Sequence, residues 1–204
     1  VMAGFSPITR LDKYINKLSD EGYTTVVWLE EEENHTVRYE HGVFSPGTFF
    51  NTQRKGITNN IMCLWVDITE SNQFTKNSLI TCGMSVIDIF TGQSNMFEYT
   101  EDFFHNPTTF DEIERFHSTY MPNEIIVIHS SYEKIKELMS FSGFECKSIH
   151  VHDKKEYENF EKQVYQKDLL KKFYKFNDYD SFYHSQPFRE YPIATQSFCF
   201  LLNF

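Results

Sequence analysis

The first fifty residues show helical spacing of apolar side chains, followed by strand-like runs. In residues 8–21 the apolar side chains recur every three or four positions, which predicts a helix that ends at Gly22. Residues 24–29 and 37–44 are rich in β-branched and aromatic side chains and predict two strands. The acidic run Glu30–Glu33 between them is typical of a solvated turn, since like charges in series resist packing. We therefore expect a small helix–strand–strand module.

From residue 61 onward, apolar runs of strand length alternate with helical periodicity. The first run is apolar on both alternating faces, which is typical of a strand in the middle of a covered sheet. Three strands joined by short connections, then a strand–helix–strand unit, predict a mixed sheet with helices on both faces. The chain is thus predicted to be α/β. Strands are expected at residues 61–68, 83–90, 93–99, 124–128 and 147–151, and helices from Pro107 to Pro122, from Ser130 to Gly143, over 156–173 and from Pro192.

Two local patterns refine this picture. Ser130 followed by Glu133 has the spacing of a capping box, which predicts that Ser130 begins the helix after the fourth strand. Residues 177–186 are polar and aromatic without clear periodicity and are expected to form a loop.

Composition narrows the function classes. The formal net charge is −10, so the chain is a poor electrostatic match for a phosphate backbone, and any DNA contact is expected on a small surface near the N-terminus. No apolar run approaches the roughly 20 residues that a membrane span needs, and the first residues lack the basic and apolar regions of a signal peptide, so none is expected. The four cysteines lack C-x-x-C spacing and are expected to be reduced, which favours an intracellular location: nucleus, organelle or viral factory.

Asp67 and Asp88 form the most tempting candidate for a catalytic site. Both lie at the ends of neighbouring predicted strands, and hard carboxylate oxygens suit Mg²⁺ in a ribonuclease-H-type nuclease. No third or fourth carboxylate is suitably placed by pattern, and Asp88 before Thr91-Gly92 is more simply a residue that braces a turn. A structural role for both is the favoured interpretation, with the metal-dependent nuclease as the alternative.

The sequence gives less support for other kinds of functional site. His150 and His152 alternate on a strand and share a face, but no further zinc ligand is predictably near, so an exposed pair is favoured. No Ser/His/Asp triad or phosphate-binding loop can be assembled. An aromatic cluster near the C-terminus lies beside Lys171, Lys172 and Lys175; it could stack on single-stranded bases, but a docking surface or ordinary core is favoured. Its members are Phe173, Tyr174, Phe176, Tyr179, Phe182 and Tyr183.

Ordered motifs at the start of the chain resemble the MutS family of DNA mismatch repair proteins. Met2-Ala3-Gly4-Phe5-Ser6-Pro7, a helix and Gly22-Tyr23 resemble the family's M-A-G-[IF]-P, helix, G-Y stretch, although Trp28 to Glu31 departs from the family's E-Q. Arg38 leading into Ser45-Pro46-Gly47-Thr48 is similar to the R-x-V-…-[ST]-P-G-T signature that closes the family's mismatch-reading domain.

Later motifs resemble the family's connector domain. Asn59-Asn60, the strand after it, and the segment with Asp88 and Gly92 are similar to N-N, a long strand and D-[IL]-x-[ST]-G. Pro122-Asn123-Glu124 is similar to N-P-x-E with the first pair inverted. The resemblance implies residues 1–50 as the end of the mismatch-recognition domain, 51–60 as a linker and 61–204 as the connector, whose C-terminal end is expected to be truncated.

The resemblance implies a non-catalytic, ribonuclease-H-like connector that relays between DNA-binding and ATPase domains. Met2, Ala3 and Gly4 would be the positions near DNA, whereas ATP and Mg²⁺ would bind in an ATPase domain outside this chain, which itself needs no cofactor. Expected partners are double-stranded DNA with mispairs, a second subunit in a homodimer or heterodimer, and a MutL-like protein. The chain is expected to be a fragment, and its Phe, Asn and Lys usage is typical of an AT-rich genome, such as that of a large virus or organelle.

Overall fold

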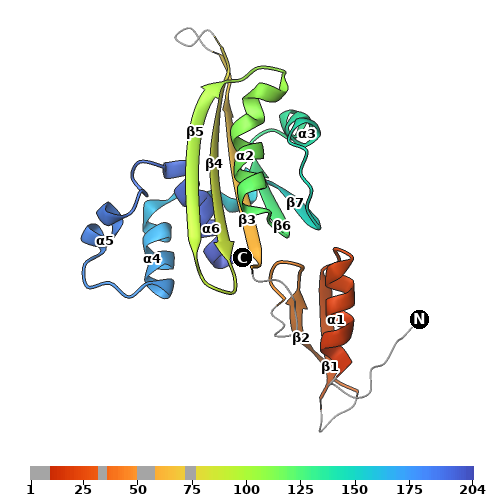
Figure 1. Cartoon of the computed structure of the whole chain (residues 1–204). Helices are drawn as coiled ribbons and strands as arrows, with labels where there is room; N and C mark the ends of the chain where they lie inside the picture. The colour runs from red at the N-terminus through yellow and green to blue at the C-terminus, as the bar shows by residue number, and fades with distance from the viewer. Residues whose placement is uncertain (1–9, 32–35, 50–57, 72–76) are drawn as a thin grey trace.

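The computed structural model describes residues 10–31, 36–49, 58–71 and 77–204, and these form two sheets. A two-stranded sheet contains β1 and β2, and a five-stranded sheet has the order β5-β4-β3-β6-β7. We call described residues 10–49 the N-terminal module and described residues 58–204 the sheet module. Figure 1 shows the N-terminal module beyond the end of the large sheet at which β3 begins. The predicted α/β class is confirmed.

The N-terminal module is built from α1 (Leu11–Asp20), β1 (Thr25–Glu30) and β2 (Arg38–Phe44). The two strands pair antiparallel, with a register shift between Val27 and Trp28. Its small core consists of Leu11, Ile15, Val27 and Phe49. Gly22 ends α1 with a φ of 85°, a backbone conformation that glycine adopts without strain, as the sequence predicted.

The large sheet has the mixed arrangement that the sequence predicted. β3, β4 and β5 pair antiparallel in sequence order, while β6 and β7 run parallel to β3 on its other side. Every residue of β6 is buried, as expected for an inner strand covered on both faces. The bounds are β3 (Asn60–Thr69), β4 (Leu79–Asp88), β5 (Ser94–Asp102), β6 (Glu124–His129) and β7 (Ser148–Asp153).

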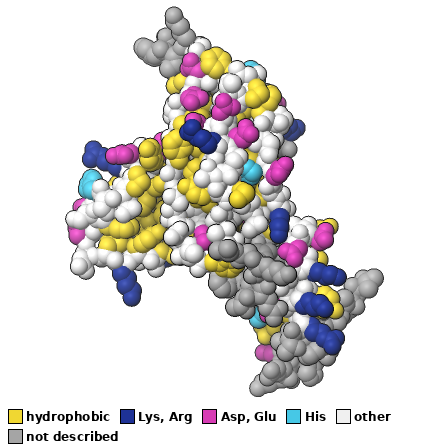
Figure 2. Space-filling model, viewed as in Figure 1, with side chains coloured by type: hydrophobic (Ala, Val, Ile, Leu, Met, Phe, Trp, Pro, Cys, Tyr) yellow, Lys and Arg dark blue, Asp and Glu magenta, His cyan; other side chains and the backbone are white. Residues whose placement is uncertain are grey.

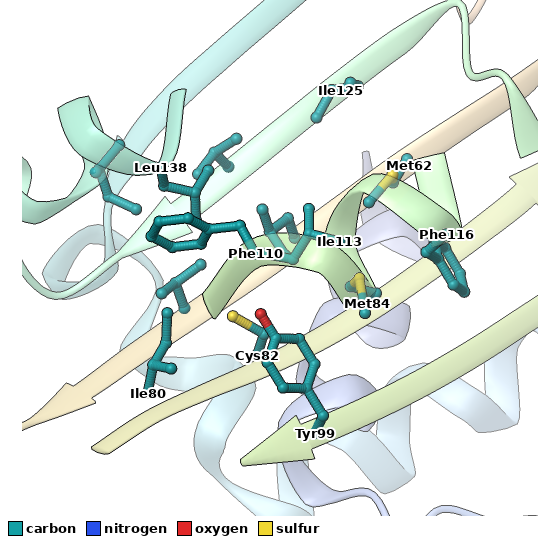
Figure 3. Packing of buried hydrophobic residues seen from close by; sticks show 14 of the residues in the cluster. Met62, Ile80, Cys82, Met84, Tyr99, Phe110, Ile113, Phe116, Ile125 and Leu138 are labelled. Carbon is teal, nitrogen blue, oxygen red and sulfur yellow. The ribbon is translucent and has the colours of Figure 1, made fainter. Parts of the chain in front are cut away.

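One face of this sheet is covered by α2 (Asp111–Tyr120), with the 3-10 turn η2 (Pro107–Phe110) before it, and by α3 (Tyr132–Phe141). Figure 3 shows Phe110 and Ile113 packed against side chains of β4, among them Met84. Apolar burial of this kind is the main stabilising contribution to the fold.

The other face is covered by η3 (Lys154–Glu161), α4 (Gln163–Phe173), α5 (Tyr179–Ser185) and α6 (Pro192–Asn203). The start of α6 is fixed by Glu98 on β5, whose Oε2 accepts hydrogen bonds from the backbone N–H groups of Ile193 (2.7 Å) and Ala194 (2.9 Å). The backbone of α6 lies so close to Gly83 on β4 that a Cβ there would overlap Ile193 and Ala194. Helices thus lie on both faces, as predicted.

Three local predictions were wrong. The single helix expected over 156–173 is divided, because Tyr157 has non-helical dihedral angles and Lys162 is extended with ψ 117°. The loop expected over 177–186 contains α5, whose N-terminus is capped by the Asp178 carboxylate accepting from the N–H of Ser181 (2.9 Å). The capping box of Ser130 and Glu133 does not form: the N-cap of α3 is Ser131, and it makes no side-chain capping bond.

Three of the four cysteines lie in the core. Cys63, Cys82 and Cys199 are buried without disulfide bonds, and burial raises the pKa of each thiol to about 12. Such thiols behave as small apolar side chains rather than nucleophiles. No helix within the described ranges is long and apolar enough to cross a lipid bilayer.

Candidate functional site

The two modules meet at a buried carboxylate, that of Glu124 at the start of β6. Its side chain is fully buried, and one oxygen, Oε2, accepts hydrogen bonds from the Ser45 hydroxyl (2.6 Å) and from the Gly47 backbone N–H (2.9 Å). The other oxygen lies 2.6 Å from Nε2 of His150 on β7. A buried carboxylate needs such partners, because burying it without them costs several kcal/mol. Glu124 therefore fixes the Ser45–Thr48 turn onto the large sheet.

The Ser45–Thr48 turn is also braced within itself. The Thr48 hydroxyl accepts from the Ser45 N–H (3.0 Å), the two hydroxyls lie 2.8 Å apart, and Ser45 Oγ accepts from the Thr48 N–H (3.2 Å). Gly47 has no room for a side chain, since a Cβ there would lie 2.7 and 2.9 Å from two carbons of Ile61 and would overlap the Glu124 carboxylate. The S-P-G-T sequence thus supplies two hydroxyls and one close backbone approach.

Asparagines extend the network into the sheet module. The Asn59 side-chain amide donates to the Gly47 carbonyl (2.6 Å), and its carbonyl oxygen accepts from the Asn123 side chain (2.9 Å). The Asn59 backbone N–H donates to Asp88 Oδ1 (3.0 Å). The predicted motif residues Gly47 and Asp88 are therefore connected through the 1%-exposed Asn59.

Asp88 closes the tight turn after β4, as the sequence suggested. Its carboxylate also accepts from the Phe90 N–H (3.1 Å) and the Thr91 hydroxyl (2.8 Å). Burial alone would raise the pKa of Asp88, but the bonds from Asn59, Thr91 and Phe90 hold its pKa below the ordinary 3.8. The ionised carboxylate is thus part of the folded arrangement, and Gly92 (φ 71°) completes the turn.

The junction does not have the geometry of a nucleophilic triad. In such a triad the serine hydroxyl bonds to the imidazole, whose other nitrogen is held by the acid. Here Ser45 bonds to the carboxylate, while Glu124 and Ser148 (3.0 Å) approach the same nitrogen of His150. Ser45 is moreover only 5% exposed. The polar groups hydrogen-bond to one another and hold the Ser45–Thr48 turn in place.

The metal pair of the nuclease alternative, Asp67 with Asp88, is contradicted by the strand register. Asp67 pairs with Thr81, and Asp88 pairs with Asn60 at the other end of β3. At roughly 3.3 Å per residue the two lie on the order of 20 Å apart, too far to hold one ion. Neighbouring antiparallel strands run in opposite directions, so their C-terminal residues lie at opposite ends of the strands' shared ladder. The prediction from the sequence did not take this into account.

Asp67 has a different partner. Lys154 Nζ lies 2.9 Å from both of its oxygens and 2.9 Å from Glu161. Burial would lower the pKa of Lys154, but these carboxylates raise it above 10.5. Among the described residues no group of three or more His, Cys, Asp or Glu is placed to hold a metal ion.

Comparison with known proteins gives a distant match. Over 121 residues, 58% of its length, the chain is 28% identical to a DNA mismatch repair protein mutS homolog of Acanthamoeba polyphaga mimivirus. The chain is distantly similar to a MutS homolog. It spans 11% of that MutS homolog's length, and no family model matches it. The match agrees with the MutS resemblance of the ordered motifs.

The remaining candidate residues from the MutS resemblance are dispersed. Met2, Ala3 and Gly4 lie outside the described residues. Arg38 lies on β2, away from the turn, and forms an exposed ion pair with Glu30 (3.4 Å).

The central roles of Glu124 and His150 were missed at the sequence level. His150 was expected to be an exposed residue, yet it is 30% exposed and bonded to Glu124. The available signal was a glutamate opening the otherwise apolar strand EIIVI, because a buried charge requires a partner.

Proposed function

We propose that this region is a non-catalytic connector of a MutS-like DNA mismatch repair protein. The similarity to the mimivirus MutS homolog and the order of the motifs along the chain support the proposal. In this proposal, the connector joins two folded parts rigidly, so that a conformational change in one part alters the other.

The observation that carries this proposal is the Glu124 junction. A turn at the end of the N-terminal module is held by three hydrogen bonds to the sheet module: Glu124 accepts two, and Asn59 donates one. Buried, fully bonded polar contacts fix one relative geometry, because any other leaves a buried charge without partners. A joint of this kind supports transmission of movement better than a flexible tether.

In the whole protein, the connector would relay between a part that reads mispairs in double-stranded DNA and an ATPase part that binds ATP and Mg²⁺. It would act in a homodimer or heterodimer, inside the cell or in a viral factory, and would help to dock a MutL-like partner. By this proposal, the acidic chain (net charge −10) contributes little to DNA affinity by itself.

The test uses the full-length product of the gene that encodes this chain, with the substitution Gly47→Ala. The added methyl group would push the turn off Glu124 and Ile61. We expect basal ATP hydrolysis within about twofold of wild type, but about tenfold less difference between mispaired and fully paired duplexes in stimulating it, a coupling of about 1.4 kcal/mol.

Gly42→Ala is the matched control, since a Cβ there meets only the ring of Phe44, at 3.1 Å. Mispair-dependent stimulation that persists in Gly47→Ala at the wild-type level would refute the relay. So would a clear preference of the isolated chain for mispaired DNA, because the proposal assigns it no reading of mispairs.

A further inference from the structure

A groove between α4 and α5 combines lysines with aromatic rings. Lys167 and Lys171 on α4, and Lys175 just beyond it, follow one another at four-residue spacing and line a cavity of about 610 Å³ together with Tyr174 and Tyr179. Lys167 Nζ lies 4.6 Å from the centre of the Tyr179 ring. Asp178 and Asp180 line the same cavity and Lys171 Nζ lies 3.8 Å from Asp168, so the three lysines leave the lining with a small positive excess in a chain of net charge −10.

A second cavity adjoins this groove at Tyr174. It has a volume of about 410 Å³ and lies between the first residues of β5 and the segment that leads to α6. Tyr174 lines both cavities, and Figure 2 shows hydrophobic side chains gathered over this side of the molecule. The walls of this second cavity combine large apolar side chains with polar ones: Met96, Phe182, Pro187, Phe188 and Phe198 beside Ser94, Asn95 and Gln186.

We propose that this groove binds a short segment of a partner protein, with one large apolar side chain followed within a few residues by acidic ones. The apolar side chain enters the cavity beside Phe182, and the acidic residues lie along the lysine row. Among the described strands, β5 lies at the edge of the sheet and pairs with β4. Ser94, Asn95 and Met96 line the second cavity, so the backbone of this strand can bond to an extended peptide there. The inference rests on the groove and does not require the proposed function.

A short acidic peptide fits this groove better than a single-stranded nucleic acid does. A polyanion needs a continuous basic track, yet Asp178 and Asp180 line the same cavity as the lysines. The rings of Phe176 and Phe182 are stacked on each other with centroids 4.8 Å apart, so each already covers one face of the other.

The binding test uses fluorescence anisotropy with labelled twelve-residue synthetic peptides and the intact chain. One peptide carries a phenylalanine followed by three acidic residues, a second has alanine in place of the phenylalanine, and a third has lysine in place of the acids. We expect binding of the first to be at least about tenfold tighter than binding of either other peptide, and weaker at high salt. A twelve-nucleotide oligothymidylate is the competing probe.

Variants locate the binding. Ser94→Trp fills the second cavity from an exposed position, because Ser94 lies on the same face of β5 as Met96. The double change Lys167→Glu with Lys171→Glu reverses the lysine row, and each variant is expected to weaken binding of the first peptide about tenfold. Lys172→Glu is the matched control, because Lys172 is exposed on α4 but does not line the groove, and it should change binding less than about twofold.

Circular dichroism melting of each variant confirms that it is folded. Absence of binding by the first peptide overturns the proposal, as does equal weakening by Lys172→Glu. Tighter binding of the oligothymidylate than of the peptide would assign the groove to nucleic acid instead.

Discussion

The N-terminal module and the sheet module differ in how completely their strands are buried. The sheet module covers both faces of its five strands, and all of β6 is buried. The N-terminal module has two strands whose outer face leaves Val26, Trp28 and Val43 about half exposed, with four buried apolar residues in its core. Because a small domain buries a smaller fraction of its surface than a large one, the smaller module gains stability from its attachment to the sheet module.

The attachment itself is polar rather than apolar. The turn meets the sheet module through Glu124 and Asn59, and the end of α1 lies against the residue before β7, where Lys147 is paired with Asp20 (3.5 Å). Apolar contacts tolerate sliding, whereas hydrogen bonds to a buried carboxylate specify position. The sheet module therefore supplies most of the buried apolar core, whereas the polar contacts of Glu124 and Asn59 fix the position of the N-terminal module.

The largest expected effect comes from breaking the sheet module at Gly83. Gly83→Ala would drive a Cβ into the backbone of Ile193 and Ala194, which is not able to move aside as a flexible side chain could. We expect a loss of about 3 kcal/mol in the free energy of unfolding, measured by urea denaturation.

Thr81→Ala, on the same strand and face, is the control for Gly83→Ala. Its hydroxyl pairs with that of Thr100 across the strands (3.0 Å), so the expected loss is about 0.5 kcal/mol. Equal losses at the two positions would show that the close approach of α6 is unimportant.

A smaller and local effect is expected at the joint. Gly47→Ala should cost about 2 kcal/mol in docking of the turn, through overlap and lost bonds to Glu124, while the sheet module stays folded. Hydrogen exchange should therefore speed up in β2 but not in β3 or β6. Uniform acceleration across both modules would mean that they unfold as one unit, and Gly42→Ala should leave exchange in the sheet module unchanged.

The smallest expected effect concerns pH. Because the folded pKa of Asp88 lies below 3.8, its ionised form stabilises the fold above that pH, and the contribution is lost as the pH falls through the lowered folded pKa. Asp88→Asn should cost about 1 to 2 kcal/mol at pH 7 and progressively less below about pH 4. A difference between the two proteins that stays constant from pH 7 to 3 would contradict this role.

Most of the fold was accessible from periodicity, because strands and helices record their burial within a few residues of sequence. The inner strand β6 was predicted from a short apolar run, and α6 from Pro192 and the apolar residues after it. The division between η3 and α4 was not, since only local dihedral angles at Tyr157 and Lys162 separate two segments whose apolar residues pack on the same face.

The junction could be predicted only in part. The S-P-G-T turn was singled out, yet its partner Glu124 lies 79 residues from Ser45, and no local pattern records a contact over that distance. The same limit explains the error on Asp67 and Asp88. Each lies at the end of a strand, but this position does not say whether the two strand ends lie side by side or at opposite ends of the ladder. Long-range pairing, rather than residue type, decides both cases.

Fastening the turn to β6 has a mechanical consequence. β6 lies between β3 and β7 and runs parallel to both, with Glu124 opposite Ile61 on one side and Ser148 on the other. A pull on the turn along the strand direction therefore loads both ladders in shear, with many bonds sharing the force, whereas a pull on an edge strand would peel a single ladder bond by bond. Because the turn is attached to β6, the sheet resists such a pull as one rigid unit.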